Sequence, residues 1–85
     1  MIGYIVFILR RAQKELAQLP VETYERVLEA IRGLAEDPRP PGYLKLTGRE
    51  GWRIRVGRHR VIYEVDDSEQ TITVLQVGHR RDVYE

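Results

Sequence analysis

The sequence contains no cysteine and only one methionine, one tryptophan and one phenylalanine among its 85 residues. Without cysteine, disulfides and thiolate metal sites are excluded, and this composition is typical of a reducing compartment, so we expect a cytoplasmic location. No apolar run approaches the roughly 20 residues that a transmembrane helix needs, and we expect no membrane association. The apolar segment 2–9 is too short for a signal peptide and lacks its basic lead-in.

The familiar sequence motifs of catalysis are also missing. There is no glycine-rich phosphate loop, no His-Glu-x-x-His zinc motif, no nucleophile elbow and no helix-turn-helix. The two histidines, His59 and His79, cannot form a metal cluster on their own. The sequence therefore predicts no metal and no cofactor, and any chemistry must use Arg, Lys, Tyr, His or Glu50.

The composition is that of a small soluble globular domain. Hydrophobic residues make up 42% of the chain and charged residues 32%, which is too apolar for a disordered chain. A chain of 85 residues can build one modest core, so we predict a single domain over residues 1–85.

Positive charge is concentrated in one part of the chain, although the formal net charge is only +1. Residues 1–44 carry six basic and six acidic side chains, which cancel. Residues 45–63 carry six basic side chains against Glu50 alone, whereas residues 64–85 carry two basic and six acidic ones. The central basic block is what an anionic ligand would meet.

The first half of the sequence predicts one strand and two helices. The β-branched and aromatic segment 2–9 reads as a strand buried on both faces for much of its length. Apolar residues at helical spacing then predict two amphipathic helices, with the stripes Leu9, Ala12, Leu16, Leu19 and Tyr24, Val27, Leu28, Ile31, Leu34, Ala35. Pro20 separates the two helices, and Asp37-Pro38 ends the second.

After the loop 38–42, the hydrophobic period changes to two. Residues 52–56, 60–65 and 71–77 read as strands joined by turns at 57–59 and 66–68. The predicted fold is a two-layer α+β domain of order β-α-α-β-β-β, in which an antiparallel sheet packs against a helical hairpin.

Period two places Arg53 and Arg55 on the face opposite Trp52, which we expect to be a packing residue. Arg60 follows the turn and can reach the same surface, so the three arginines form a candidate site for an anion. The alternative is a solvated strand face neutralised by Glu50 and Glu64, since exposed arginines are common. His59 lies in the predicted turn, where a solvated side chain is the expectation.

The last residues, VGHRRDVYE, place His79, Arg80, Arg81 and Tyr84 directly after a strand. Functional side chains favour such positions on a rigid scaffold. The alternative is a frayed tail in which Tyr84 docks for packing alone.

Four features together resemble the RelE-type toxins of toxin–antitoxin modules, within the RelE/ParE superfamily. They are the helical hairpin broken at Leu19-Pro20, the segment Lys45-Leu46-Thr47-Gly48, the arginine-rich run ending in Arg60-Val61-Ile62-Tyr63, and the ending from Val77 to Tyr84. The resemblance covers essentially the whole chain.

The resemblance implies a metal-independent endoribonuclease that cuts mRNA in the ribosomal A site and inhibits translation. It also implies a RelB-like antitoxin that blocks the toxin in a hetero-oligomer. Its implied catalytic residues are Arg53, Arg55, Arg60, Arg80 and Tyr84, and its implied RNA contacts are Lys45, Arg49, Arg58, His79 and Arg81.

One departure from the family concerns proton transfer. Some relatives carry lysines where this chain has Arg53 and Arg55, and arginine holds its proton too firmly to act as a base. Tyr84 is then the first candidate for proton transfer or base stacking, His79 the second and Glu50 a distant third. Two other functions stay open: a ParE-like gyrase inhibitor without nuclease activity, and a module that binds RNA without cutting it.

Overall fold

The structure is a computed structural model, and it describes residues 3–79. The elements follow in the order β1 (Ile5–Ile8), α1 (Arg10–Ala17), α2 (Val21–Leu34), β2 (Leu44–Lys45), β3 (Trp52–Val56), β4 (His59–Asp66) and β5 (Thr71–His79). Within residues 3–79, no helix is both long and apolar enough to span a membrane.

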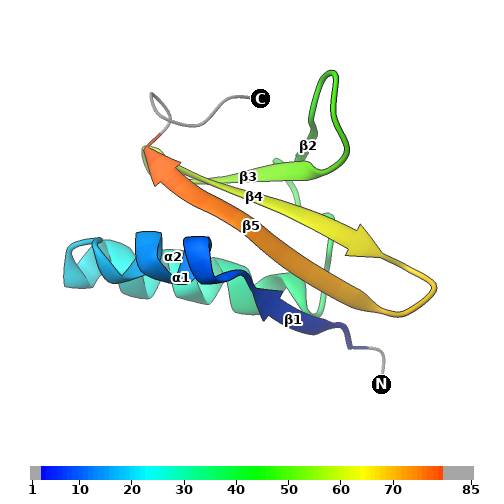
Figure 1. The fold of residues 1–85 in the computed structure, drawn as a ribbon, viewed down its shortest axis with the longest axis horizontal. Coiled ribbons are helices and arrows are strands. Elements are labelled where there is room, and N and C mark those ends of the chain that lie inside the picture. The colour runs from blue at the N-terminus through cyan, green and yellow to red at the C-terminus, as the bar shows by residue number, and fades with distance from the viewer. Residues whose placement is uncertain (1–2, 80–85) are drawn as a thin grey trace.

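The strands form one twisted sheet of order β1-β5-β4-β3-β2, and the two helices pack on one side of it (Figure 1). The predicted two-layer α+β class and order of elements are confirmed. The sheet is mixed rather than wholly antiparallel, because β1 joins its edge parallel to β5. A two-residue strand, β2, is added at the opposite edge by antiparallel pairing with β3.

The helical hairpin forms where the sequence predicts it. Pro20 is the N-cap residue of α2, and its fixed φ is compatible with the first turn that follows. Ala12 and Leu16 of α1 are buried, as are Val27, Ile31 and Leu34 of α2. The apolar stripe of each helix therefore packs on the sheet.

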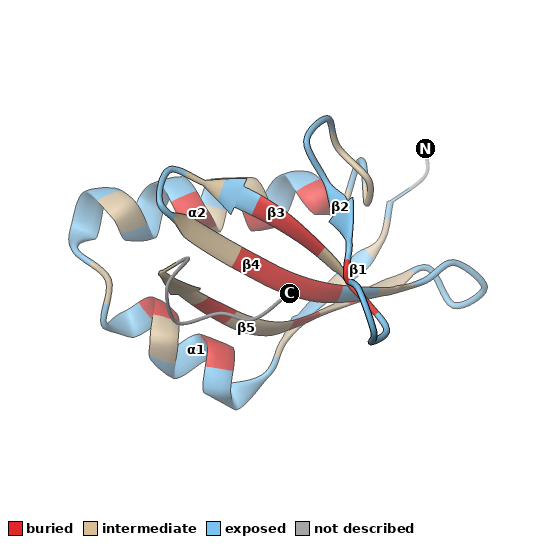
Figure 2. Ribbon diagram, turned by 90° about the horizontal axis from the view of Figure 1, so that it is seen from above, coloured by how far each residue is buried: buried red, intermediate tan, exposed pale blue. Residues whose placement is uncertain are grey.

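The core has a main part and a small second part. The main part lies between helices and sheet, and its largest fully buried side chain is Tyr63 of β4. On the other side of the sheet, Leu46 and Ile62 are buried together, with Leu75 packed against them. The middle of β4 is therefore buried on both sides of the sheet, as its red colour in Figure 2 shows.

The expectation that the first strand is buried on both faces is wrong. The side chains of β1 alternate, with Ile5 62% and Phe7 53% exposed, while Val6 and Ile8 pack against the core. The reason is that β1 is an edge strand and the helices cover only one side of the sheet.

One irregularity interrupts the pairing of β4 with β5. Ile62 pairs with Gln76, but the next residue, Tyr63, pairs with Val74, so Leu75 is an extra residue. Such a β-bulge changes which side chains face the helices. Val74 before the bulge and Val77 after it both belong to the main core, although they are three residues apart.

The loop after α2 is fastened to the sheet at two points. The Tyr63 hydroxyl donates a hydrogen bond of 2.7 Å to the Pro38 carbonyl oxygen. Arg39 contacts both carboxylate oxygens of Asp67, at 3.3 and 2.9 Å, and Tyr4 donates to the same carboxylate at 2.7 Å. These contacts hold the proline-rich segment against β3 and β4.

Candidate functional site

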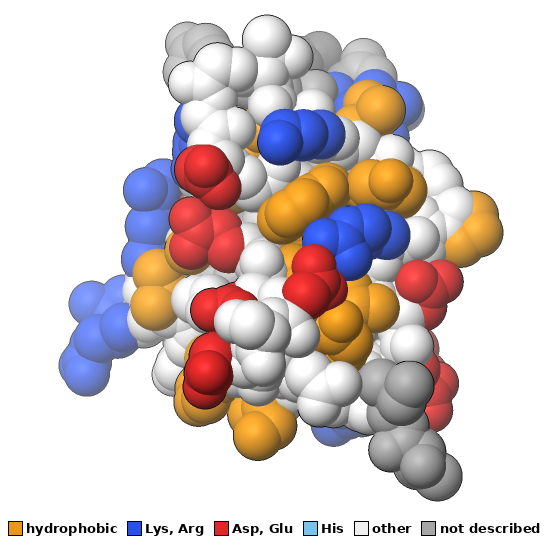
Figure 3. Space-filling view, turned by 90° about the vertical axis from the view of Figure 1, so that its right-hand side faces the viewer, with side chains coloured by type: hydrophobic (Ala, Val, Ile, Leu, Met, Phe, Trp, Pro, Cys, Tyr) orange, Lys and Arg blue, Asp and Glu red, His pale blue; other side chains and the backbone are white. Residues whose placement is uncertain are grey.

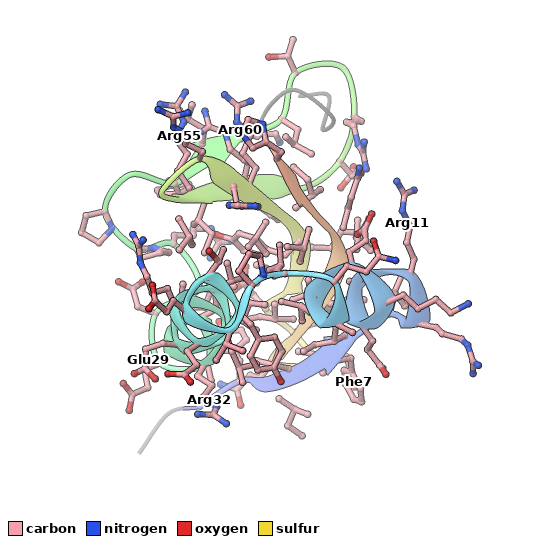
Figure 4. All side chains as sticks on the ribbon, turned by 90° about the vertical axis from the view of Figure 1, so that its left-hand side faces the viewer. Phe7, Arg11, Glu29, Arg32, Arg55 and Arg60 are labelled. Atoms are coloured by element: carbon pink, nitrogen blue, oxygen red, sulfur yellow. The ribbon has the colours of Figure 1, made fainter. Side chains whose placement is uncertain are left out.

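Two arginines meet at one end of the sheet. Arg55 of β3 and Arg60 of β4 are direct partners in the register, because only the two-residue turn 57–58 separates the strands. Figure 4 shows both side chains at the end of the sheet and directed away from the helices. Like charges that face one another across a strand pair repel, and this pairing concentrates positive charge at one end of the sheet.

Arg53 shares its side of β3 with Arg55, since the two are two residues apart. Its register partner is Ile62 of the second core cluster, and only 3% of Arg53 is exposed. Burial, and then the nearby charge of Arg55, lower the pKa of the Arg53 guanidinium. Arg53 and Arg55 thus lie on the predicted face of β3. Within the arginine cluster of Arg53, Arg55 and Arg60, however, Arg53 is buried, whereas Arg55 is exposed.

The alternative in which Glu50 and Glu64 neutralise the arginines does not fit Arg55. Within residues 3–79, Arg55 forms no ion pair. Glu50 and Glu64 instead line a groove with Asp66 and Asp67. Acidic side chains gather on that side of the molecule, which faces the viewer in Figure 3. The acidic groove thus lies at the opposite end of β3 and β4 from Arg55 and Arg60, and Arg39 pairs with Asp67 beside it.

Lys45 lies apart from the arginines. Its register partner is Trp52, and its ammonium nitrogen is 5.9 Å from the centre of the Trp52 ring. Arg39 lies over the same ring at 4.8 Å. Trp52 is half-buried, stacks with Tyr63 at 6.4 Å and packs on the main core, which confirms it as a packing residue.

Two other predicted RNA contacts lie in loops. Arg49 is exposed in the segment between β2 and β3, and Arg58 is exposed in the β3–β4 turn. Arg58 lines a small groove with Arg26 of α2 and with His59. Neither Arg49 nor Arg58 is a register partner of a residue in the arginine cluster.

His59 and His79 face each other across the β4–β5 ladder. Their ring centres are 5.6 Å apart, in an edge-to-face arrangement. Burial, and then the neighbouring His79, lower the pKa of His59. His59 is half-buried rather than solvated, because it opens β4 instead of remaining in the turn.

His79 is separated from the arginine cluster. It lines a groove with Arg11 and Glu15 of α1, on the helical side of the sheet. The register partner of Arg60 is the preceding residue, Gly78, so His79 has the opposite orientation. The remaining predicted site residues, Arg80, Arg81 and Tyr84, lie outside the described residues.

Sequence reasoning missed a groove beside Arg55. It has a volume of about 630 Å³ and is lined by Ala30, Gly33, Pro40, Pro41, Gly42, Leu44, Arg53, Ile54 and Arg55. The proline-rich loop forms one wall because its contacts to Tyr63 and Asp67 hold it near β3. An apolar groove with a guanidinium at its rim suits a flat, weakly polar group attached to an anion. The only sequence signal for it was the loop 38–42 itself.

Several known proteins are similar to this chain in sequence or in fold. A sequence profile for the ParE toxin of type II toxin-antitoxin systems matches residues 6–84. Toxin RelG of Mycobacterium tuberculosis is 33% identical over an alignment of length 85, which covers 95% of this chain and 95% of RelG. The RelBE2 toxin–antitoxin complex of M. tuberculosis matches with a TM-score of 0.80 and 31% identity, over 96% of this chain and 97% of that chain. The archaeal RelE–RelB complex of Pyrococcus horikoshii matches with a TM-score of 0.80 and 32% identity, over 95% and 99%.

Proposed function

Because the chain belongs to the RelE/ParE superfamily of type II toxin–antitoxin toxins, we propose that it is a ribosome-dependent endoribonuclease that cleaves mRNA in the A site. The family predicted from the sequence motifs is thereby confirmed. The choice of RNA cleavage over other activities of the superfamily rests on the arginine cluster.

The observation that carries the proposal is the opposition of Arg55 and Arg60, with Arg53 beside them. Guanidinium groups bind phosphate through two parallel hydrogen bonds and stay charged at any physiological pH. A phosphate between Arg55 and Arg60 would meet a guanidinium on each side. The acidic groove lies at the other end of the sheet, and this polarity would orient the basic end toward a polyanion.

The proposed reaction is an in-line transfer at phosphorus. The 2′-oxygen of the RNA attacks the adjacent phosphorus, the bond to the 5′-oxygen breaks, and a 2′,3′-cyclic phosphate forms. A base takes the proton of the 2′-hydroxyl, and an acid donates a proton to the leaving 5′-oxygen. Preorganised arginines stabilise the negative charge that builds up on the phosphoryl oxygens.

The described residues limit which groups can transfer these protons. Arginine is unsuited to act as a base. Glu50 precedes β3 and lines the acidic groove, whereas Arg55 lies near the other end of that strand. His79 points to the helical side of the sheet. Tyr84 therefore stays the first candidate, and the ribosome would supply the orientation of the attacking hydroxyl.

A RelB-like antitoxin is the proposed protein partner. The solved complexes from M. tuberculosis and P. horikoshii pair a toxin of this fold with its antitoxin. An antitoxin segment that brings carboxylates to Arg55 and Arg60 would associate quickly because of charge complementarity, and apolar burial would slow its release.

A second function is supported by the ParE profile, which covers nearly the whole chain. ParE-like action would mean inhibition of DNA gyrase without cleavage of RNA, on the same scaffold. A module that binds RNA but no longer cuts it is the third possibility.

Toeprinting of mRNA on programmed ribosomes with purified toxin tests the proposal. We expect cuts positioned at the A-site codon that fall at least tenfold in Arg55→Gln and vanish in Arg80→Ala. Arg32→Gln is the matched control, because Arg32 is an exposed arginine of α2 far from the cluster (Figure 4). Intact mRNA together with inhibited gyrase supercoiling would establish the second function instead, and RNA binding without either effect would establish the third.

A further inference from the structure

The fold brings together the only two histidines of the chain, which are 20 residues apart in sequence. His59 is the first residue of β4 and His79 the last of β5, and the two are direct register partners. The bulge at Leu75 is what aligns them, because it places Val77 and His79 on the same side of the sheet as Val61 and His59. The sequence shows no metal-binding motif because the spacing arises only in the folded sheet.

The separation of the two rings suits a shared metal ion. A metal bound by one nitrogen of each imidazole, at about 2.0–2.1 Å, would place the two ring centres roughly 5 Å apart. The observed distance between ring centres is 5.6 Å. The two rings are therefore close enough to share one ion. Imidazole nitrogen favours Cu²⁺, Ni²⁺ and Zn²⁺ over Mg²⁺ or Ca²⁺.

The groove around the histidines has a volume of about 370 Å³ and is bounded by α1. Glu15 lies in this groove, but its Oε1 accepts a hydrogen bond from the Val77 amide at 2.7 Å and its Oε2 one from Arg11 at 3.3 Å. Residues 3–79 contain no group of three potential metal-binding side chains. Water would therefore occupy the remaining coordination positions, and the groove has room for it.

We propose that His59 and His79 bind one divalent transition-metal ion and thereby fasten the end of β5 to the start of β4. Affinity follows the order Cu²⁺ above Ni²⁺ and Zn²⁺. The site is on the helical side of the sheet and so is separate from the arginine cluster. It fixes the backbone at Gly78, the register partner of Arg60.

Calorimetric titration of untagged wild-type protein with NiCl₂ and ZnCl₂ tests this site. We expect one ion per chain, a melting temperature that rises with metal concentration, and no response to MgCl₂. His59→Gln and His79→Gln should each weaken binding at least tenfold. Gln13→Ala, which changes an exposed side chain of α1, should bind as the wild type does.

Paramagnetic broadening of NMR signals by substoichiometric Cu²⁺ gives a second readout that needs no variant. Broadening centred on residues 59 and 77–79 would support the site, even if the histidine variants fold poorly. Broadening centred elsewhere would overturn it. So would unchanged binding in both histidine variants, or no binding by the wild type at millimolar metal.

Discussion

The hydroxyl of Tyr63, whose side chain is fully buried in the middle of β4, donates a 2.7 Å hydrogen bond to the carbonyl oxygen of Pro38. This contact joins the central strand to the loop that forms one wall of the groove beside Arg55. It therefore links the core directly to the surroundings of the candidate site.

Tyr63→Phe should lower the free energy of unfolding by about 1–2 kcal/mol. The ring would keep its packing, but the Pro38 carbonyl would lose its donor in a partly buried position. Urea denaturation measures the change. Tyr24→Phe, at a more exposed tyrosine of α2, serves as the control and should leave the midpoint nearly unchanged. Equal effects of the two substitutions would contradict a structural role for the Tyr63 hydrogen bond.

Because the Tyr63 hydroxyl is buried, we expect the free energy of unfolding to fall in alkali. Burial raises the pKa of Tyr63 to about 12, from its ordinary value of 10.0. Because the folded state favours the neutral phenol, its stabilisation is complete below pH 10 and is lost as the pH rises toward 12. Stability measured between pH 9 and 12 should show the wild type losing its advantage over Tyr63→Phe across this window. A constant difference would refute this prediction.

Acid should weaken the contact between the N-terminal segment and the β4–β5 turn. Arg39 and then Tyr4 hold the pKa of Asp67 below its ordinary value of 3.8. The stabilisation is therefore present above pH 3.8 and is lost as the pH falls through the lower folded-state value. Asp67→Asn should be less stable than the wild type at pH 6, and the gap should close on acidification. Glu36→Gln, at an exposed carboxylate after α2, serves as the control.

Arg55→Gln should raise stability while it reduces activity. Removal of one of two opposed guanidiniums relieves repulsion of about 0.2–1 kcal/mol across the strand pair. The gain should shrink in 1 M salt, where charges are screened within about 3 Å. Thermal unfolding at two salt concentrations measures it, with Arg32→Gln for comparison. A salt-independent loss of stability would show that Arg55 is held by contacts rather than strained by charge.

Two glycines should respond in opposite directions to the same substitution. Gly51 has a φ of +117°, and an added Cβ would lie 3.0 Å from the Tyr63 carbonyl oxygen. Gly51→Ala should therefore cost about 1–3 kcal/mol. Gly33 lies in α2, and an added Cβ would meet nothing within 4 Å. Gly33→Ala should stabilise by about 0.5 kcal/mol through the entropy of the unfolded chain. Chemical denaturation of both variants tests the pair.

The sequence predicted those features that depend on local periodicity. The helical stripes, the break at Pro20 and the direction of Arg53 and Arg55 follow from spacings of 3.6 and 2 residues. The exposure of Phe7 did not follow, because an edge strand and a central strand can have the same apolar composition. Nor did the burial of Arg53, whose register partner is Ile62 of the second core cluster.

Parts of the candidate site could be predicted only with knowledge of the register of the sheet. Lys45 and the arginines are neighbours in a basic stretch of sequence, yet the pairing of Lys45 with Trp52 takes its side chain to the other side. The contact between His59 and His79 needed both the pairing and the bulge. Periodicity alone cannot supply either, because each is set by contacts between distant segments.

Because Leu75 is an extra residue, the alternation of side chains along β5 changes phase at this point. Before it, the even-numbered Ile72 and Val74 face the helices, and after it the odd-numbered Val77 and His79 do so. Deletion of Leu75 would remove the bulge and restore an unbroken alternation of side chains, in which Val77 and His79 still face the helices.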